Sequence, residues 1–196
     1  MTILLPLARA IESREPYSLG HSDRVSAFAE VVARQLGWDD ERRELLRLCG
    51  MLHDIGKLAV PASVLRKPGP LDDDERAEVL RHPEAGARII GHVGQLRVTV
   101  PAVLHHHERW DGRGYPTGRA RDAIPEEARI LAVADSFDAM TSNRPYRRAL
   151  PARVALEELA RCAGTQFDPE LALLFVEAWE RGAFALPAAL RAAATS

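Results

Sequence analysis

Apolar residues recur at helical spacing along most of the chain, whereas the alternating pattern of a β-strand is almost absent. About three or four apolar positions in every two turns form one stripe, as expected for a helix that packs against a core. The first two stripes comprise Ile3, Leu4, Leu7, Ala8 and Ile11, and then Val25, Phe28, Ala29, Val32 and Leu36. The pattern predicts an all-α fold.

Start and stop signals for helices divide the rest of the chain. Gly37 is placed to end the second helix, and a helix that begins with capping acids near residue 39 is expected to end at Gly56. Asp72 and Glu75 resemble a capping box. Pro or Asp also begins three later predicted helices, in segments 125–140, 151–164 and 168–182.

Three segments are predicted to be irregular because they are rich in Pro, Gly or Arg: 58–71, 108–124 and 142–151. Each follows a predicted helix end that carries His or Asp. No low-complexity linker and no internal repeat divides the 196 residues, of which 46% are hydrophobic. We therefore expect one domain over residues 1–196.

Composition narrows the classes of function. Lys and Arg number 26 against 28 acids, so the net charge of -2 gives no general attraction to a nucleic-acid polymer or an anionic membrane. No segment approaches the roughly 20 apolar residues of a membrane span. Cys49 and Cys162 are far apart in helical patterns and are expected to be reduced, buried thiols. These features predict a soluble, cytoplasmic protein.

Histidine and aspartate side chains supply the candidate chemistry. Five of the seven histidines fall at predicted helix ends beside the Gly- and Pro-rich loops. Each residue alone is more typical of a helix cap or a solvated surface, but together they have the oxygen and nitrogen donors of a metal site. The candidates are His21, His53, Asp54, His82, His106, His107 and Asp135.

Two pairs of candidates are adjacent in sequence: His53 with Asp54, and His106 with His107. Neighbours on a helix point about 100° apart, so one helix face cannot direct both members of a pair at one ion unless the helix end distorts. Two neighbouring metal ions remove this difficulty, with the aspartate bridging them.

The motifs resemble the HD-GYP family, a subgroup of the HD phosphohydrolases that hydrolyses cyclic di-GMP in bacteria. The resemblance covers about residues 20–171. It is carried by HDIGK (53–57), HPEAG (82–86), HHERWDGRGYP (106–116) and ADSFDAMTSNRPYR (134–147). It implies an HD-type helical bundle with its metal site at helix ends.

The family's metal ligands correspond to the seven candidates above, which leaves His105 and His92 as solvated or outer residues. The resemblance also implies that the GYP loop of Gly114, Tyr115 and Pro116 lies beside the metal cleft and serves contacts with a signalling partner. Some members have Glu four residues before the first histidine and bind three metals. Tyr17 occupies that position here, so we expect two divalent ions, with Fe preferred and Mn, Zn or Ni as alternatives.

Lys57, Arg144 and Arg147 are the predicted substrate contacts, because in the family the corresponding cations face phosphate groups. Two divalent ions can activate water for attack on a phosphodiester, and Asp54 and Lys57 are the predicted catalytic residues. Asp138 is expected to orient a ligand or to pair with an arginine.

The resemblance predicts hydrolysis of cyclic di-GMP to linear pGpG, with slower conversion to GMP. Three alternatives stay open: an HD phosphohydrolase acting on another nucleotide, a non-catalytic module that binds through the GYP loop, and an oxygen-activating di-iron enzyme. The intact ligand set argues against the second alternative, and the cations Lys57, Arg144 and Arg147 argue against the third.

Overall fold

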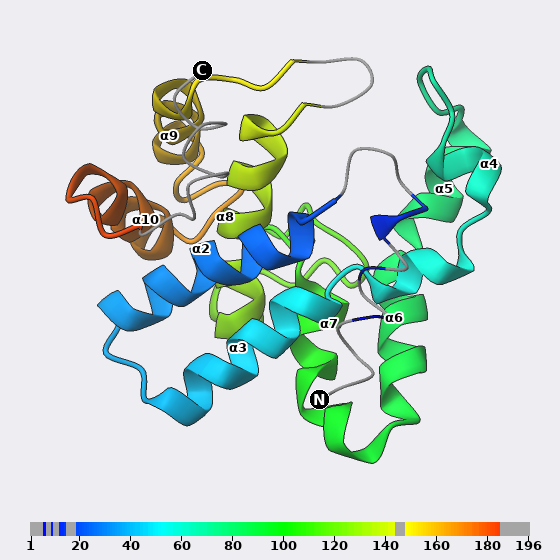
Figure 1. Ribbon diagram of the computed structural model, residues 1–196, viewed down its shortest axis with the longest axis horizontal. Coiled ribbons are helices and arrows are strands. Elements are labelled where there is room, and N and C mark those ends of the chain that lie inside the picture. Colours follow the sequence, from blue (N-terminus) through cyan, green and yellow to red (C-terminus); the bar gives the residue numbers. More distant parts are fainter. Residues whose placement is uncertain (1–5, 7–8, 10–11, 15–18, 144–147, 185–196) are drawn as a thin grey trace.

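The computed structural model describes residues 6, 9, 12–14, 19–143 and 148–184, and most of this part of the chain is helical (Figure 1). The longer helices are α2 (His21–Gln35), α3 (Asp40–Leu52), α5 (Asp73–Leu80), α6 (His82–Gly91), α8 (Glu126–Thr141), α9 (Ala152–Arg161) and α10 (Pro169–Glu180). The shorter ones are α4 (Ala62–Leu65) and α7 (Val100–His105), with 3-10 helices η1 (Ile55–Ala59), η2 (Gly94–Thr99) and η3 (Arg121–Ala123).

These elements confirm the all-α prediction. Across the described ranges, β-structure is limited to an isolated bridge between Ala163 and Phe167, and no helix has both the length and the apolar character needed to cross a membrane. The first apolar stripe, Tyr17, Arg144 and Arg147 lie outside the described residues. The expectation of one domain over residues 1–196 stays a prediction.

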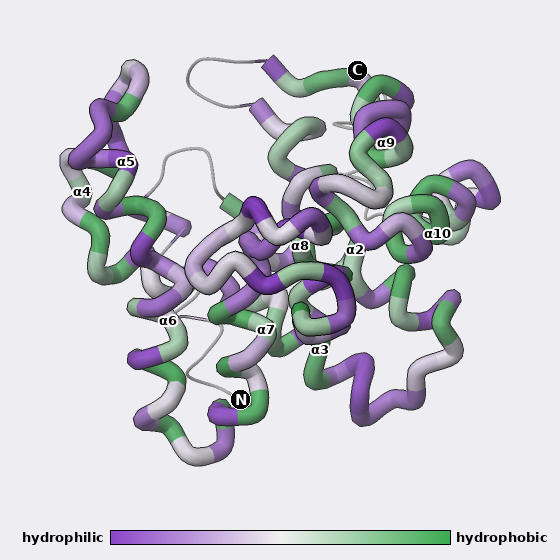
Figure 2. The backbone as a smooth tube through the Cα atoms, turned by 180° about the vertical axis from the view of Figure 1, so that it is seen from behind, coloured by the Kyte–Doolittle hydropathy of each residue, from purple (hydrophilic) through white to green (hydrophobic). Residues whose placement is uncertain are grey.

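The main core lies among α2, α3, α8, α9 and α10, which cluster at one side of the ribbon in Figure 1. Phe28 of α2 is at its centre, edge-on to Phe137 of α8 with ring centroids 5.2 Å apart. Phe175 of α10 packs 4.9 Å from the same Phe137 ring. Viewed from behind and coloured by hydropathy, the helices carry green and purple positions in alternation, as amphipathic helices do (Figure 2).

A second, smaller cluster fills the space among α3, η1, α6, η2 and α7. It consists of Leu52, Ile55, Ile90, Leu96 and Val103. Side by side in Figure 1, α6 and α7 stand apart from α9 and α10, and α4 and α5 lie beyond α6. The two clusters therefore build two sides of the molecule that α2, α3 and α8 connect.

Two glycine backbones meet where η1 crosses α6. A Cβ atom on Gly56 would lie 1.8 Å from the carbonyl oxygen of His82 and 2.5 Å from the amide nitrogen of Gly86. Gly86 in turn has the Gly56 nitrogen 3.2 Å from its own ideal Cβ position. This close approach brings the start of α6, with His82, against the turn that follows Asp54.

The boundaries of several elements agree with the sequence signals, and two do not. The Asp72–Glu75 capping box is present, with both reciprocal bonds at 2.9 Å, and Gly37 follows α2 with φ 72°. The helix expected to end at Gly56 ends instead at Leu52, because the chain tightens into η1 to bring Gly56 against α6. Segment 58–71, expected to be irregular, contains the short helix α4.

Replacing Gly56 by Ala is expected to destabilise the protein by about 3 kcal/mol or more, because backbone atoms cannot yield to the added methyl group as a flexible side chain can. The loss of about 6 °C or more in Tm can be measured by thermal denaturation followed by circular dichroism. Gly91→Ala is the matched control, since nothing lies within 4 Å of a Cβ there and alanine favours the helix. Equal Tm values for the two variants would contradict the packing argument.

Candidate metal centre

The sequence-predicted ligands lie where helices begin and end. His21 is the first residue of α2 and His82 the first residue of α6. His53 and His106 are the C-cap residues of α3 and α7, so Asp54 and His107 follow directly after a helix. Asp135 differs, because it lies within α8. Four helix ends and one helix face therefore converge on the same place.

Two groups of potential ligand atoms share one carboxylate. Asp54 forms one group with His82, His106 and His107, and another with His21 and His53, and the atoms within each group lie within 4.8 Å of one another. Oδ1 of Asp54 is 3.3 Å from Nε2 of His82. Oδ2 is 3.5 Å from Nε2 of His53 and 3.7 Å from Nε2 of His21. The two oxygens of one aspartate thus face different groups of imidazoles.

Asp135 lies beside the second group, next to His21. Its Oδ1 lies 3.4 Å from Nε2 of His21. The structure therefore brings together all seven residues that the sequence indicated. It also shows that both members of an adjacent pair can reach one group, since His106 and His107 do so, as do His53 and Asp54. Each pair straddles the last turn of a helix, where the regular 100° rotation no longer applies.

Backbone carbonyl groups orient three of the imidazoles. Nδ1 donates to the carbonyl oxygen three residues earlier in each case, at 2.6 Å for His53, 2.8 Å for His82 and 2.7 Å for His106. A carbonyl oxygen can only accept, so Nδ1 carries the proton. The lone pair on Nε2 then points into the site, as a metal ligand requires.

A carboxylate orients the fourth imidazole. Nδ1 of His21 lies 2.7 Å from Oδ2 of Asp138, and the guanidinium of Arg24 donates to both carboxylate oxygens of Asp138. Asp138 thus both orients a candidate ligand and pairs with an arginine, the two roles that the sequence left as alternatives. Arg24 itself gives no signal in the sequence beyond lying one turn after His21.

The charges at the site differ between the two groups. Burial, followed by the neighbouring histidines, holds the pKa values of His106 and His107 well below the usual range, and burial also lowers the pKa of His82. Burial opposes ionisation of Asp54 too, yet Lys57 and the surrounding imidazoles keep its pKa well below its usual range. In the other group burial opposes protonation of His21, but its hydrogen bond to Asp138 and the charge of Asp135 raise its pKa. The carboxylate of Asp54 among the neutral imidazoles of the first group is the protonation state that binds a cation.

The donor set fits a divalent transition metal. It consists of imidazole nitrogens and carboxylate oxygens without a thiolate, because neither buried cysteine belongs to either group. Such donors suit Fe, Mn, Zn or Ni. The carbonyl and carboxylate partners of the histidines match the outer contacts that ligating histidines usually have.

Lys57 lies beside the shared carboxylate. Its Nζ is 2.8 Å from Oδ2 of Asp54, three residues earlier in the chain. The turn that begins η1 creates this proximity, with the amide of Lys57 donating to the carbonyl of Asp54 at 2.9 Å. Lys57 is therefore a cation at the edge of the site, whereas Arg144 and Arg147 lie outside the described residues.

The GYP loop packs directly on a candidate ligand. The ring of Tyr115 stacks on the imidazole of His107 with centroids 4.9 Å apart, and its amide donates to the carbonyl of His107 at 3.3 Å. A Cβ on Gly114 would lie 2.3 Å from the nitrogen of Arg109, so only glycine fits there. Pro116 follows through a cis peptide bond. The loop thus forms a wall of the site, as the resemblance implied.

Glu108 holds the GYP loop in place through hydrogen bonds, a role that the sequence alone does not indicate. Its Oε1 accepts from the amide and the hydroxyl of Thr117, each at 2.7 Å. The side chain is buried, and Oε2 has no hydrogen-bond partner among the described residues. The position of Glu108 directly after two candidate ligands, in HHE, was the available signal.

The two histidines outside the ligand set differ from each other. His92 is exposed, as expected. His105 is 3% exposed, so of the two alternatives, a solvated or an outer residue, the solvated one does not apply, and its Nδ1 lies 3.5 Å from Oε1 of Glu108. The reason is the direction of α7, whose last turn buries His105 against Glu108 rather than presenting it to water.

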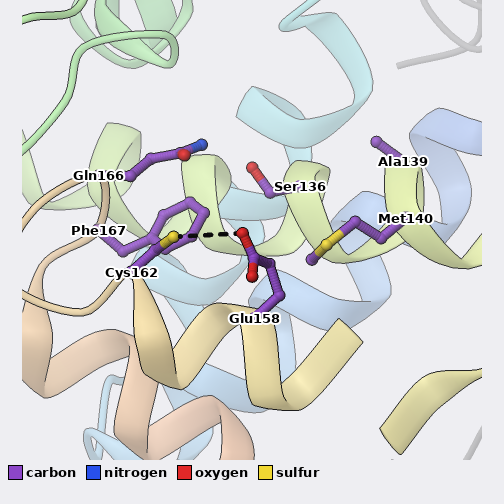
Figure 3. A pocket seen from close by; sticks show the side chains of 7 residues that line it. All are labelled: Ser136, Ala139, Met140, Glu158, Cys162, Gln166 and Phe167. Carbon is purple, nitrogen blue, oxygen red and sulfur yellow. Dashed lines mark hydrogen bonds between the residues drawn. The ribbon is translucent and has the colours of Figure 1, made fainter. Parts of the chain in front are cut away.

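A separate hollow lies between α8 and α9 (Figure 3). It has a volume of about 290 Å³ and is lined by Ser136, Ala139, Met140, Glu158, Cys162, Gln166 and Phe167. None of the candidate ligands contributes to it. The Cys162 thiol donates to Glu158 at 3.5 Å, and burial raises its pKa, so the thiol stays protonated.

The described residues form helices and no strands, and several of these helices begin or end at one cluster of His and Asp side chains. These two features place the protein in the class of metal-binding helical domains. The chain belongs to the HD domain family, whose model matches residues 6–171. This membership and the relatives below confirm the resemblance to HD-GYP proteins that the motifs indicated.

Curated relatives include the cyclic di-GMP phosphodiesterase response regulator RpfG of Xanthomonas campestris pv. campestris, 46% identical over 165 residues, which cover 83% of this chain and 44% of RpfG. The 3'3'-cGAMP-specific phosphodiesterase 3 of Vibrio cholerae is 38% identical, covering 86% of this chain and 36% of that protein. The chain thus spans less than half the length of these relatives.

Solved structures share the fold. The V. cholerae cyclic GMP-AMP phosphodiesterase V-cGAP3 aligns with a TM-score of 0.71 and 19% identity, over 93% of this chain and 49% of that one. The HD domain of the phosphodiesterase PgpH from L. monocytogenes, in complex with cyclic-di-AMP, aligns with a TM-score of 0.64 over 93% of this chain and 98% of that one.

Thr117→Val is expected to destabilise the protein by about 1 kcal/mol relative to Thr117→Ser, because it removes a hydroxyl donor from the buried carboxylate of Glu108. Serine keeps the hydroxyl and is the matched control. Chemical denaturation of the two variants measures the difference, and equal stabilities would show that the amide of Thr117 alone holds Glu108.

Proposed function

We propose that this chain is a metal-dependent phosphodiesterase that hydrolyses cyclic di-GMP to linear pGpG in bacterial second-messenger signalling, in the cytoplasm. The observation that carries the proposal is the carboxylate of Asp54, whose two oxygens face two groups of imidazoles. Relatives that are 36–46% identical to the chain over the aligned residues and are named as cyclic di-GMP phosphodiesterases support it.

Two divalent ions would be held by the seven residues, with Asp54 between them. When bound, the ions would supply an activated water molecule and neutralise charge on the phosphodiester. The carbonyl-bonded imidazoles of His53, His82 and His106 keep their Nε2 lone pairs directed inward without reorganisation. Iron is the preferred metal in this proposal.

Lys57 supplies a fixed positive charge next to Asp54. An ammonium group acts as a point charge on a phosphate oxygen and gains strength where charge develops in the transition state. Its half-buried position beside the shared carboxylate would place it close to the bond that breaks. Arg144 and Arg147 are proposed to hold the phosphate group that is not cleaved.

The base preference of the proposed enzyme is inferred from its relatives. The relatives include enzymes named for cyclic di-GMP and enzymes named for 3'3'-cGAMP, which differ by one base. The relatives of higher identity to this chain, at 46% and 44%, are named for cyclic di-GMP, so that substrate is preferred. A signalling partner at the GYP loop stays a prediction from the family resemblance.

Protein purified without chelator is expected to contain close to two transition-metal ions per chain by elemental analysis, since Asp54 belongs to both groups. His21→Ala and His107→Ala should each lower the content by about one ion, because each removes a ligand from one group only. His92→Ala is the control and should keep both ions. One ion or none in the wild-type protein would contradict the binuclear assignment.

A time course with cyclic di-GMP should show pGpG accumulating well before GMP. The ring presents its phosphodiester preorganised, whereas the flexible linear product loses entropy to rebind. Chromatography separates the three nucleotides, and a parallel assay with 3'3'-cGAMP and cyclic di-AMP tests the base preference.

Single substitutions of Asp54, Lys57 and Arg144 test the separate roles of these residues in the same assay. Asp54→Ala should abolish turnover while helical circular dichroism persists, and Lys57→Ala should lower kcat more than it raises KM. The reverse pattern is expected for Arg144→Ala. Formation of GMP without a pGpG phase, or full activity of Asp54→Ala, would refute the proposed reaction.

A further inference from the structure

Helix α2, which carries His21 as its first residue, lacks a side-chain cap of its own. Its N-cap residue is Gly20, with φ 73°, and glycine has no side chain to accept from the free amides of the first turn. Glu12, nine residues before His21, takes this place. Its Oε2 accepts from the amide of Gly20 at 2.9 Å and its Oε1 from the amide of Ser22 at 2.7 Å.

The Glu12 side chain is buried for this purpose, with an exposed fraction of 6%. A buried carboxylate is costly unless both oxygens are satisfied, and the two amides on either side of His21 satisfy them. A negative charge also suits the positive end of a helix dipole. Glu12 therefore fixes the backbone on both sides of His21.

Arg14, two residues after Glu12, contacts η1 rather than α2. Its guanidinium donates to the carbonyl oxygens of Lys57 at 3.2 Å, Leu58 at 2.9 Å and Val60 at 3.0 Å. These are the carbonyls at the end of η1, the helix that follows Asp54. A positive group at the C-terminal end of a helical turn matches the partial negative charge there.

Glu12 and Arg14 stand two residues apart and thus tie the start of α2 to the end of η1. The side chains that these two elements direct into the site are neighbours, with Nε2 of His21 3.7 Å from Oδ2 of Asp54. Through Glu12 the segment acts on His21, which belongs to one ligand group only. Through Arg14 it acts on the turn that follows Asp54, and Asp54 belongs to both groups.

We propose that Glu12 and Arg14 are positioning residues that hold His21 and the Asp54–Lys57 turn at the separation that metal binding requires. This inference rests on the metal site proposed above. Neither residue contacts the reacting atoms, and each acts through the backbone of a residue that does. Loss of the Glu12 contacts would selectively weaken the group of His21, His53 and Asp54, whereas loss of the Arg14 contacts would weaken both groups.

The test is metal affinity, measured by titrating chelator-treated protein with Mn²⁺. Glu12→Gln places an amide N–H against a backbone N–H, and it should raise the dissociation constant of the ion that His21→Ala also weakens by about 10- to 100-fold, while the other ion stays near its wild-type value. Arg14→Ala should weaken the binding of both ions, and Arg14→Lys should do so less, because an ammonium keeps the charge although it cannot span three carbonyls. Arg9→Ala, an exposed arginine just upstream, should change nothing.

A double variant separates positioning from general destabilisation. If Glu12 acts through His21, adding Glu12→Gln to His21→Ala should cause no further loss of metal affinity. Wild-type affinity for both ions in Glu12→Gln, even with a lowered Tm, would overturn the inference. So would an additional loss in the double variant.

The proposed function can fail independently of this inference. If the wild-type protein binds two ions in the expected pattern but cleaves none of the cyclic dinucleotides, the reaction assignment fails and the positioning role stands. If the wild-type protein hydrolyses cyclic di-GMP and Glu12→Gln retains both ions at unchanged affinity, the positioning role fails alone.

Discussion

The carboxylate of Asp54 is the constraint on which the rest of the site depends. Its two oxygens must face opposite groups of imidazoles, so the chain has to leave α3 immediately before this residue and turn sharply after it. The turn is possible because Gly56, the second residue of η1, lies against the backbone of α6. The positions of His82 and Lys57 follow from that crossing, the first across the interface and the second along the turn. A single acidic residue therefore links the local geometry of α3, η1 and α6.

Helix ends serve this purpose better than helix faces. At an end, successive side chains escape the fixed rotation of a helix, and the last carbonyl groups are free to accept from Nδ1 of a histidine. The structure uses that property repeatedly, because His53, His82 and His106 each bond to a carbonyl three residues earlier. The carbonyl groups at helix ends, which normally require capping, thus orient the histidine ligands. The two apolar clusters then determine where each helix ends.

The fold class and the convergence of the ligands could be predicted from the sequence, because helical periodicity and the spacing of His and Asp motifs are local signals. The end of α3 could not, since Gly56 marks a contact with α6 that is distant in sequence rather than a helix stop. The choice between a solvated and an outer position for His105 could not be made for a similar reason, because it depends on the direction of α7. Glu12, Arg14 and Arg24 act on backbone or on other side chains across many residues, and no spacing rule identifies such partners.

The crossing of Gly56 and Gly86 joins main chain to main chain, and this has a consequence for sequence divergence. Rotamer changes and substitutions elsewhere on η1 or α6 alter the surroundings of the crossing but not its width, because no side chain separates the two backbones. The distance between the turn that follows Asp54 and the start of α6 is therefore insensitive to substitutions that spare the two glycines. Other residues of η1 and α6 can change while Asp54 and His82, which belong to the same ligand group, keep their separation.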